Sequence, residues 1–183
     1  MKKFLLGILL ILLGGVINTG SYMIELTPNF IGSFFLLLAL SEFKIKDRNL
    51  TWSLWILTGI YLLNYIISAI NPSIVPIQLH PILTGGSLLW GVYVSIKIVE
   101  KANFNYEESS RRNLNFICRW FNFLLVVSVC VTAGMIGILS TQGVINLICV
   151  WIYTIGSFMG AIARYALAYL FYKQVKLEKK TMI

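Results

Sequence analysis

An apolar run near the end of the chain reads VINLICVWIYTIGSFMGAIARYALAYLFY over residues 144–172. It holds a single charged residue, Arg164. A helix needs about 20 consecutive apolar residues to cross the hydrocarbon core of a bilayer, which is about 30 Å thick. The stretch therefore predicts a transmembrane helix with one charge inside it.

Five further apolar segments precede this one. The six predicted transmembrane helices cover about 4–24, 28–43, 52–70, 81–99, 115–139 and 144–172. Composition agrees, because 58% of the 183 residues are apolar and 12% are charged, against about 45–50% and about 25% in an ordinary soluble domain. These figures exclude a soluble enzyme, a disordered protein and a disulfide scaffold. We expect an all-α, polytopic membrane protein with one domain over residues 1–183.

The basic residues predict the orientation. The chain has 15 Lys and Arg and a net charge of +8. If the N-terminus is cytoplasmic, all of these residues except Arg164 fall in cytoplasmic segments, which is where membrane proteins concentrate Lys and Arg. The sequence thus predicts six helices, both termini cytoplasmic and a location in the cytoplasmic membrane. We expect no nucleic-acid partner. The expected partners are the bilayer, anionic lipid at the cytoplasmic loops and a partner subunit or second copy of the chain.

Arg164 is the first candidate functional residue, because charge inside a membrane is costly and usually functional. Gly156, Gly160 and Arg164 are spaced by four, and a Gly-x-x-x-Gly pair allows helices to pack closely. This spacing favours an Arg164 that points into the bundle. The alternative is a long side chain that reaches the cytoplasmic interface. A second stripe of small residues, also predicted to contact another helix, is formed by Ser87, Gly91 and Ser95.

A polar cluster is predicted at the outer face. Asn18, Glu25 and Asn29 belong to the turn between the first two apolar segments, and His80 comes just before the fourth. If these segments meet, Glu25 and His80 form a proton-sensitive pair or the mouth of a ligand site. The alternative is a set of interfacial polar residues and helix caps. One His and one Glu do not make a metal site, which normally needs three or four ligands, so we expect neither a metal nor a cofactor.

Two resemblances bear on the class of protein. The run IELTPNFIG over residues 24–32, with its Leu-rich helix and charged loop, resembles a group of small multi-pass membrane proteins of Gram-positive bacteria. Their hairpin typically reads Leu-Pro-Asp-Phe-Ile-Gly, and Thr27 and Asn29 stand here where that group has Leu and Asp. The resemblance implies location and architecture, without an assigned activity.

The architecture of six helices with short loops is similar to the substrate-binding subunits of energy-coupling-factor vitamin transporters. Those subunits bind a small molecule near the outer face and dock on a partner complex through small residues of the first helix. The Ala-x-x-x-Ala pattern used there is missing from this chain, whose first apolar segment offers Gly7, Gly14 and Gly15 instead.

The leading hypothesis for function is a small-molecule transport or ligand-binding component of the membrane. Its predicted ligand-binding residues are Arg164, Glu25, His80, Asn18 and Asn29. One alternative is a non-catalytic accessory or scaffold subunit of a membrane complex. Another is an intramembrane enzyme similar to quorum-peptide processing endopeptidases, which use a His and Cys pair. Because Ser87 stands seven residues after His80 in place of a Cys, we expect no enzymatic activity.

Overall fold

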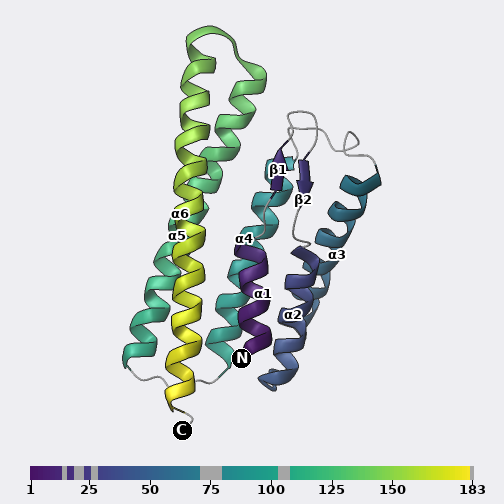
Figure 1. Ribbon diagram of the computed structural model, residues 1–183, viewed down its shortest axis with the longest axis vertical. Coiled ribbons are helices and arrows are strands. Elements are labelled where there is room, and N and C mark those ends of the chain that lie inside the picture. The colour runs from purple at the N-terminus through teal and green to yellow at the C-terminus, as the bar shows by residue number, and fades with distance from the viewer. Residues whose placement is uncertain (14–15, 19–22, 26–28, 71–79, 103–107, 182–183) are drawn as a thin grey trace.

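The computed structural model describes residues 1–13, 16–18, 23–25, 29–70, 80–102 and 108–181, with side chains over 1–13, 29–67, 85–102 and 108–177. The described part is almost entirely helical. Its elements are α1 (Lys2–Leu13), β1 (Val16–Asn18), β2 (Met23–Glu25), α2 (Asn29–Glu42), α3 (Arg48–Ile70), α4 (His80–Lys101), α5 (Glu108–Ser140) and α6 (Gly143–Thr181). The two short strands pair antiparallel, with Ile17 opposite Ile24. The helices alternate in direction, so both ends of the chain lie at one end of the bundle (Figure 1).

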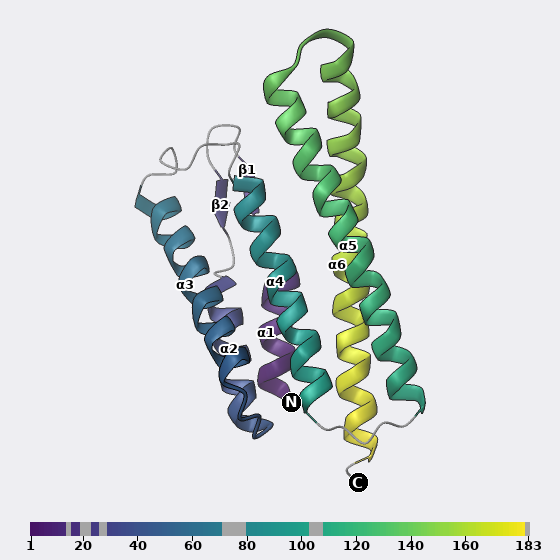
Figure 2. The same cartoon turned by 180° about the vertical axis from the view of Figure 1, so that it is seen from behind.

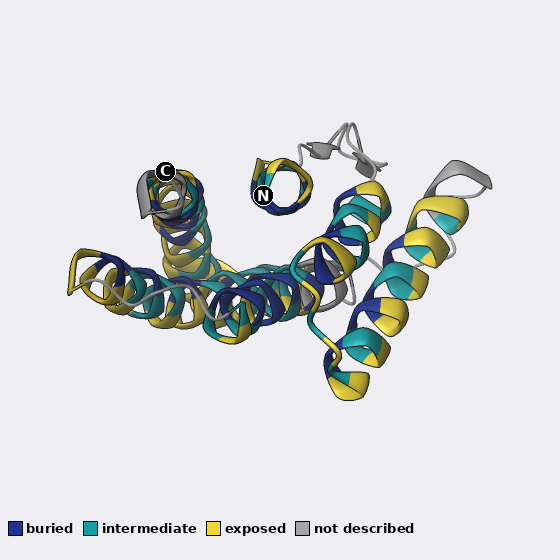
Figure 3. Ribbon diagram, turned by 90° about the horizontal axis from the view of Figure 1, so that it is seen from below, coloured by how far each residue is buried: buried dark blue, intermediate teal, exposed yellow. Residues whose placement is uncertain are grey.

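The helices form two groups that pack on each other near the termini. Helices α1 to α4 make one group, and α5 and α6 make a long hairpin that contacts α4 and α1. The ring of Phe4 on α1 lies 5.9 Å from the ring of Phe171 on α6 and 5.9 Å from that of Phe43. Both Phe4 and Phe171 are fully buried. Viewed from the end with the termini, buried residues lie on the faces that the helices turn toward one another (Figure 3).

The hairpin extends well past the other four helices (Figures 1 and 2). At 1.5 Å per residue, α5 with 33 residues is about 50 Å long and α6 with 39 is about 58 Å, whereas α3 with 23 is about 35 Å. The far part of the hairpin exposes apolar side chains, including Val144 (74%), Ile145 (61%) and Trp151 (60%). Such a surface is unfavourable in water and favourable in contact with lipid or a protein partner.

Three helical segments of the described part are long and apolar enough to cross a membrane: Arg48–Ile67, Glu108–Ser140 and Gly143–Leu177. Membrane location therefore follows at this coarse level from length and composition. Helix α2 is apolar but has only 14 residues, which is short of the roughly 20 that a full helical crossing needs.

The expected first transmembrane helix over 4–24 is wrong beyond Leu13, where α1 ends. Two glycines, Gly14 and Gly15, come next in the sequence, and glycine is the poorest helix former after proline. The β-branched residues Val16 and Ile17 follow and lie in β1, in agreement with their strand preference. An apolar run is thus a sign of burial in lipid or protein, and it does not by itself specify a continuous helix.

Helix α2 lies within its predicted limits of 28–43, whereas α3 to α6 extend beyond theirs. Helix α3 starts at Arg48, four residues before the expected 52, because Asp47 caps it: the backbone N–H of Leu50 donates to Asp47 Oδ1 at 3.1 Å. Helix α5 starts at Glu108 instead of 115, and α6 continues to Thr181 instead of 172. These extensions are polar, and hydropathy does not detect a helix once it leaves the apolar layer.

Candidate functional site

Arg164 lies on the face of α6 that turns toward α1. It is half-buried, and it shares a stripe with Ala168 and Phe171, four and seven residues further on. Because Phe171 packs on Phe4, this stripe faces the first group of helices. Arg164 lies about 10 Å along the helix axis from Phe171, toward the far end of the bundle.

The guanidinium of Arg164 is poorly satisfied. Its Nε donates to the backbone oxygen of Gly160 at 3.4 Å, which is a long hydrogen bond. Among the described residues it has no ion-pair partner. A guanidinium carries five N–H donors, so most of its capacity is open to an anion, a carbonyl or water. This makes Arg164 the strongest candidate for ligand contact in the described part of the chain.

The small residues of α6 and α4 lie at close helix contacts. A Cβ atom added to Gly156 would lie 2.8 Å from Val131 Cγ2 of α5, and one added to Gly160 would lie 3.4 Å from Val127 Cγ1. A Cβ on Gly91 would lie 3.1 Å from Ile11 Cγ2 of α1. The neighbours of Gly91 on the small-residue stripe, Ser87 and Ser95, are buried. Ser95 Oγ donates to the backbone oxygen of Gly91 at 2.8 Å.

The predicted outer cluster lies mostly outside the described side chains. Asn18 ends β1, Glu25 ends β2 and His80 begins α4, and nothing is described of these three side chains. The strands and the first turns of α2 and α4 lie toward the end of the first helix group that is opposite the termini (Figure 1). The side chain of Asn29 is described: its Oδ1 is buried and has no hydrogen-bond partner in the described part. The contact between Glu25 and His80 stays a prediction.

The structure contains a buried polar network between α5 and α6 that the sequence analysis did not predict. Asn113 Nδ2 donates to Gln174 Oε1 at 2.8 Å and to the backbone oxygen of Leu170 at 3.1 Å. Gln174 Nε2 donates to Ser110 Oγ at 2.6 Å. All three side chains are at most 5% exposed. The available signal was the spacing of Ser110, Asn113 and Ile117, which is that of a buried helix stripe.

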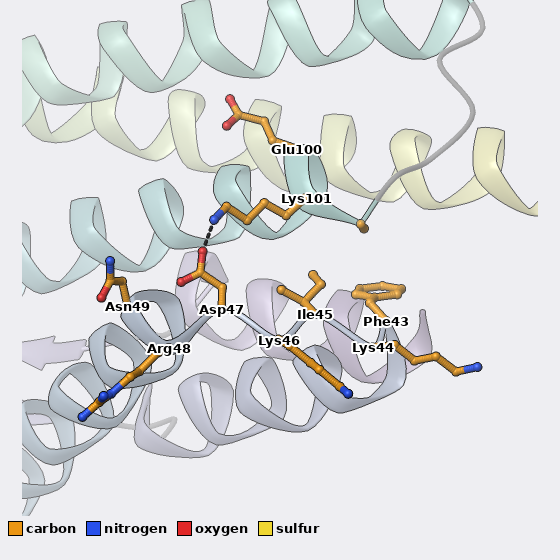
Figure 4. Close-up of a pocket in the computed structure, with 10 residues that line it drawn as sticks. Phe43, Lys44, Ile45, Lys46, Asp47, Arg48, Asn49, Glu100 and Lys101 are labelled. Carbon is orange, nitrogen blue, oxygen red and sulfur yellow. Dashed lines mark hydrogen bonds and ion pairs between the residues drawn. The ribbon is translucent and has the colours of Figure 1, made fainter.

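A polar pocket of about 670 Å³ lies at the turn between α2 and α3, at the end of the bundle that holds the termini (Figure 4). Lys101 of α4 forms an ion pair with Asp47, which also caps α3. The side chains of Lys46 and Arg48 point away from this pair. The ion pair joins α4 to the turn, and the outward cations leave a basic surface that attracts anions.

Comparison with protein-family models, with curated proteins and with solved structures finds no match to this chain. Among the described residues, no three His, Cys, Asp or Glu side chains gather in a way that would hold a metal ion. Function has to be argued from the chemistry of the sites themselves.

Proposed function

We propose that the protein is a multi-pass membrane protein that binds a small anionic molecule, such as a carboxylate or phosphate, between the α5–α6 hairpin and the first helix group. Arg164 is the observation that carries this proposal. A half-buried guanidinium on a bundle-facing stripe, without an ion-pair partner among the described residues, is costly in an apolar layer unless an anion or water meets it. A transport or ligand-binding component of the membrane uses such a group to hold its substrate.

The orientation that we propose has both termini on the cytoplasmic side. The helix ends near the termini carry the basic residues Lys2, Lys3, Lys44, Lys46, Arg48, Lys101, Arg111, Arg112, Lys173 and Lys176. At the opposite end, the described residues include no Lys or Arg. Helices α1 and α2 have 12 and 14 residues and run in opposite directions. Both ends of this pair therefore lie on the same side of the membrane, whether or not the pair crosses it completely.

Cysteine labelling tests this orientation. In a variant without Cys118, Cys130 and Cys149, a cysteine at Gln142 should react with a membrane-impermeant maleimide on intact cells. A cysteine at Glu108 should react only after the cells are permeabilised. Gln142 follows α5 and Glu108 begins it, so the two report opposite ends of one helix. The reverse pattern would overturn the orientation.

The test of the binding proposal is the thermal stability of the purified protein in a panel of anions. Inorganic phosphate, sulfate and succinate are suitable first members, because ligand binding to the folded state raises the unfolding temperature. For any anion that stabilises the wild type, Arg164→Gln should weaken binding about tenfold, which corresponds to the loss of a charge-assisted hydrogen bond. Arg164→Lys should recover part of the affinity. Arg111→Gln, which removes an exposed charge far from Arg164, is the matched control.

Equal binding by Arg164→Gln and Arg111→Gln would contradict the proposal. Failure of the whole panel would favour the second candidate function, an accessory subunit that acts through a partner. That candidate has its own support in the far part of the hairpin, where Val144, Ile145 and Leu147 are all more than half exposed. An exposed apolar patch of this kind marks a site of contact with a membrane or with another protein.

A further inference from the structure

An apolar groove of about 440 Å³ runs between the two helices of the α5–α6 hairpin. Phe123, Val126 and Cys130 line its α5 side, and Trp151 and Ile155 are among the residues on its α6 side. Trp151 and Ile155 are 60% and 57% exposed, so the groove is open to the surroundings of the protein. In a bilayer these surroundings are lipid chains.

The groove lies on the side of α5 that is turned away from α4. Phe121 faces α4, since its ring lies 6.5 Å from the ring of Tyr93. With 3.6 residues per turn, Phe123 and Cys130 fall roughly opposite Phe121 around the helix. The groove is therefore separate from the bundle-facing stripe of Arg164, and an occupant reaches it from the side.

Cationic side chains lie beyond one end of the groove, on the same helix faces. On α5, Arg119 is four residues before Phe123, so the two are neighbours on one face. On α6, Lys173 comes eighteen residues after Ile155, which is five full turns and returns to the same face. Both side chains are exposed. They lie toward the termini, where Tyr169 adds an exposed aromatic ring of the kind found at bilayer interfaces.

These cations are available to an anion. The guanidinium of Arg119 lies 5.9 Å from the ring centroid of Phe116 and, in the described part, has no carboxylate partner. Lys173 likewise has no ion pair with any residue whose side chain is described. A groove without charge, with two cations beyond its end on the same helix faces, matches a molecule with an apolar chain and an anionic head.

We propose that the α5–α6 hairpin binds one anionic phospholipid. An acyl chain lies in the groove against Trp151 and Cys130, and the phosphate lies between Arg119 and Lys173. The charge pattern decides between this occupant and a second copy of the chain. A second copy would have to bring acidic side chains to the two cations, and the sequence has 7 Asp and Glu against 15 Lys and Arg.

The test is native mass spectrometry of the full chain in detergent with an equimolar mixture of dioleoylphosphatidylglycerol and dioleoylphosphatidylcholine. The wild type should retain the anionic lipid in preference to the zwitterionic one by roughly thirtyfold, since Arg119 and Lys173 each contribute about 1 kcal/mol near the membrane surface. Arg119→Gln should reduce that preference about fivefold. Cys130→Trp, a substitution at an exposed position that fills the groove, should abolish retention of both lipids.

Arg111→Gln is the matched control, because it removes an exposed arginine from another face of the same helix and should leave the preference unchanged. A second measurement needs no variant: alkylation of Cys130 in the wild type should slow several-fold with phosphatidylglycerol and not with phosphatidylcholine. Equal retention of the two lipids, equal behaviour of Arg119→Gln and Arg111→Gln, or a lipid-free species of two chains that protects Cys130 would each overturn the proposal.

Discussion

Gly32→Leu is expected to prevent α1 from packing on α2 and to lower the free energy of unfolding by about 3 kcal/mol, the upper range for overpacking a close contact. A Cβ atom on Gly32 would lie 2.9 Å from the backbone oxygen of Gly7, and one on Gly7 would lie 2.7 Å from the backbone oxygen of Gly32. Backbone atoms cannot move as a side chain does, so the helices must separate. The buried contacts of Ile8, Ile11 and Leu36 are lost with them.

The measurement is the thermal unfolding midpoint of the purified variant in detergent. A loss of about 3 kcal/mol corresponds to a fall of roughly 6–12 °C for a chain of this size. Gly59→Leu is the control: Gly59 is exposed on α3, and an added Cβ would meet nothing within 4 Å. If the Gly32 and Gly59 variants unfold at the same temperature, the close crossing of α1 and α2 is wrong.

The Gly7–Gly32 contact shows what sequence spacing cannot detect. Stripes such as Gly156 and Gly160 are visible because both members lie on one helix, four residues apart. Gly7 and Gly32 lie on two different helices, separated in the sequence by β1 and β2. The contact between them depends on the position at which α2 packs against α1 after the two strands. The sequence predicted a tight hairpin between the first two apolar segments, but it did not predict which glycines would meet.

The direction of Arg164 was only partly predictable. The spacing by four suggested that Gly156, Gly160 and Arg164 share a face. Four residues turn an α-helix by about 400°, so each step of four moves about 40° around the axis. Gly156 therefore faces α5, whereas Arg164, two steps further, has turned toward the stripe of Phe171 and α1. The stripe faces the bundle along its whole length, but its first residues face α5 and its later residues face α1.

Hydropathy indicated the class of protein and the number of helices, but not their relative heights. The apolar part of α6 begins at Gly143, at the far tip of the hairpin, and continues to Lys173, where the basic residues of its last turns begin. The layer of the first helix group ends sooner, because α3 and α4 are shorter. The positions of the helices along the bundle axis depend on contacts such as that between Phe4 and Phe171, which join residues far apart in the sequence.

Gln174→Leu is expected to destabilise the protein by about 2 kcal/mol, because it removes two buried hydrogen bonds between α5 and α6. Ser110 Oγ loses the donor at 2.6 Å and Asn113 Nδ2 loses its acceptor at 2.8 Å. Asn113 Oδ1 is already buried without a hydrogen-bond partner in the described part, so the loss falls on a site that is dry and already short of partners. The unfolding midpoint should fall by roughly 4–8 °C.

A double-mutant cycle separates this network from simple packing. Asn113→Leu alone should also destabilise the protein, because it leaves the amide of Gln174 with one partner fewer. The pair Asn113→Leu and Gln174→Leu should cost less than the sum of the two, since apolar groups then meet each other and fewer polar atoms are stranded. Asn122→Leu, the same change at an exposed position of α5, should have little effect. Strict additivity of the two buried changes would mean that the two amides do not interact across the hairpin, and the register of α5 on α6 would then rest on other contacts, such as those of Gly134 and Gly156.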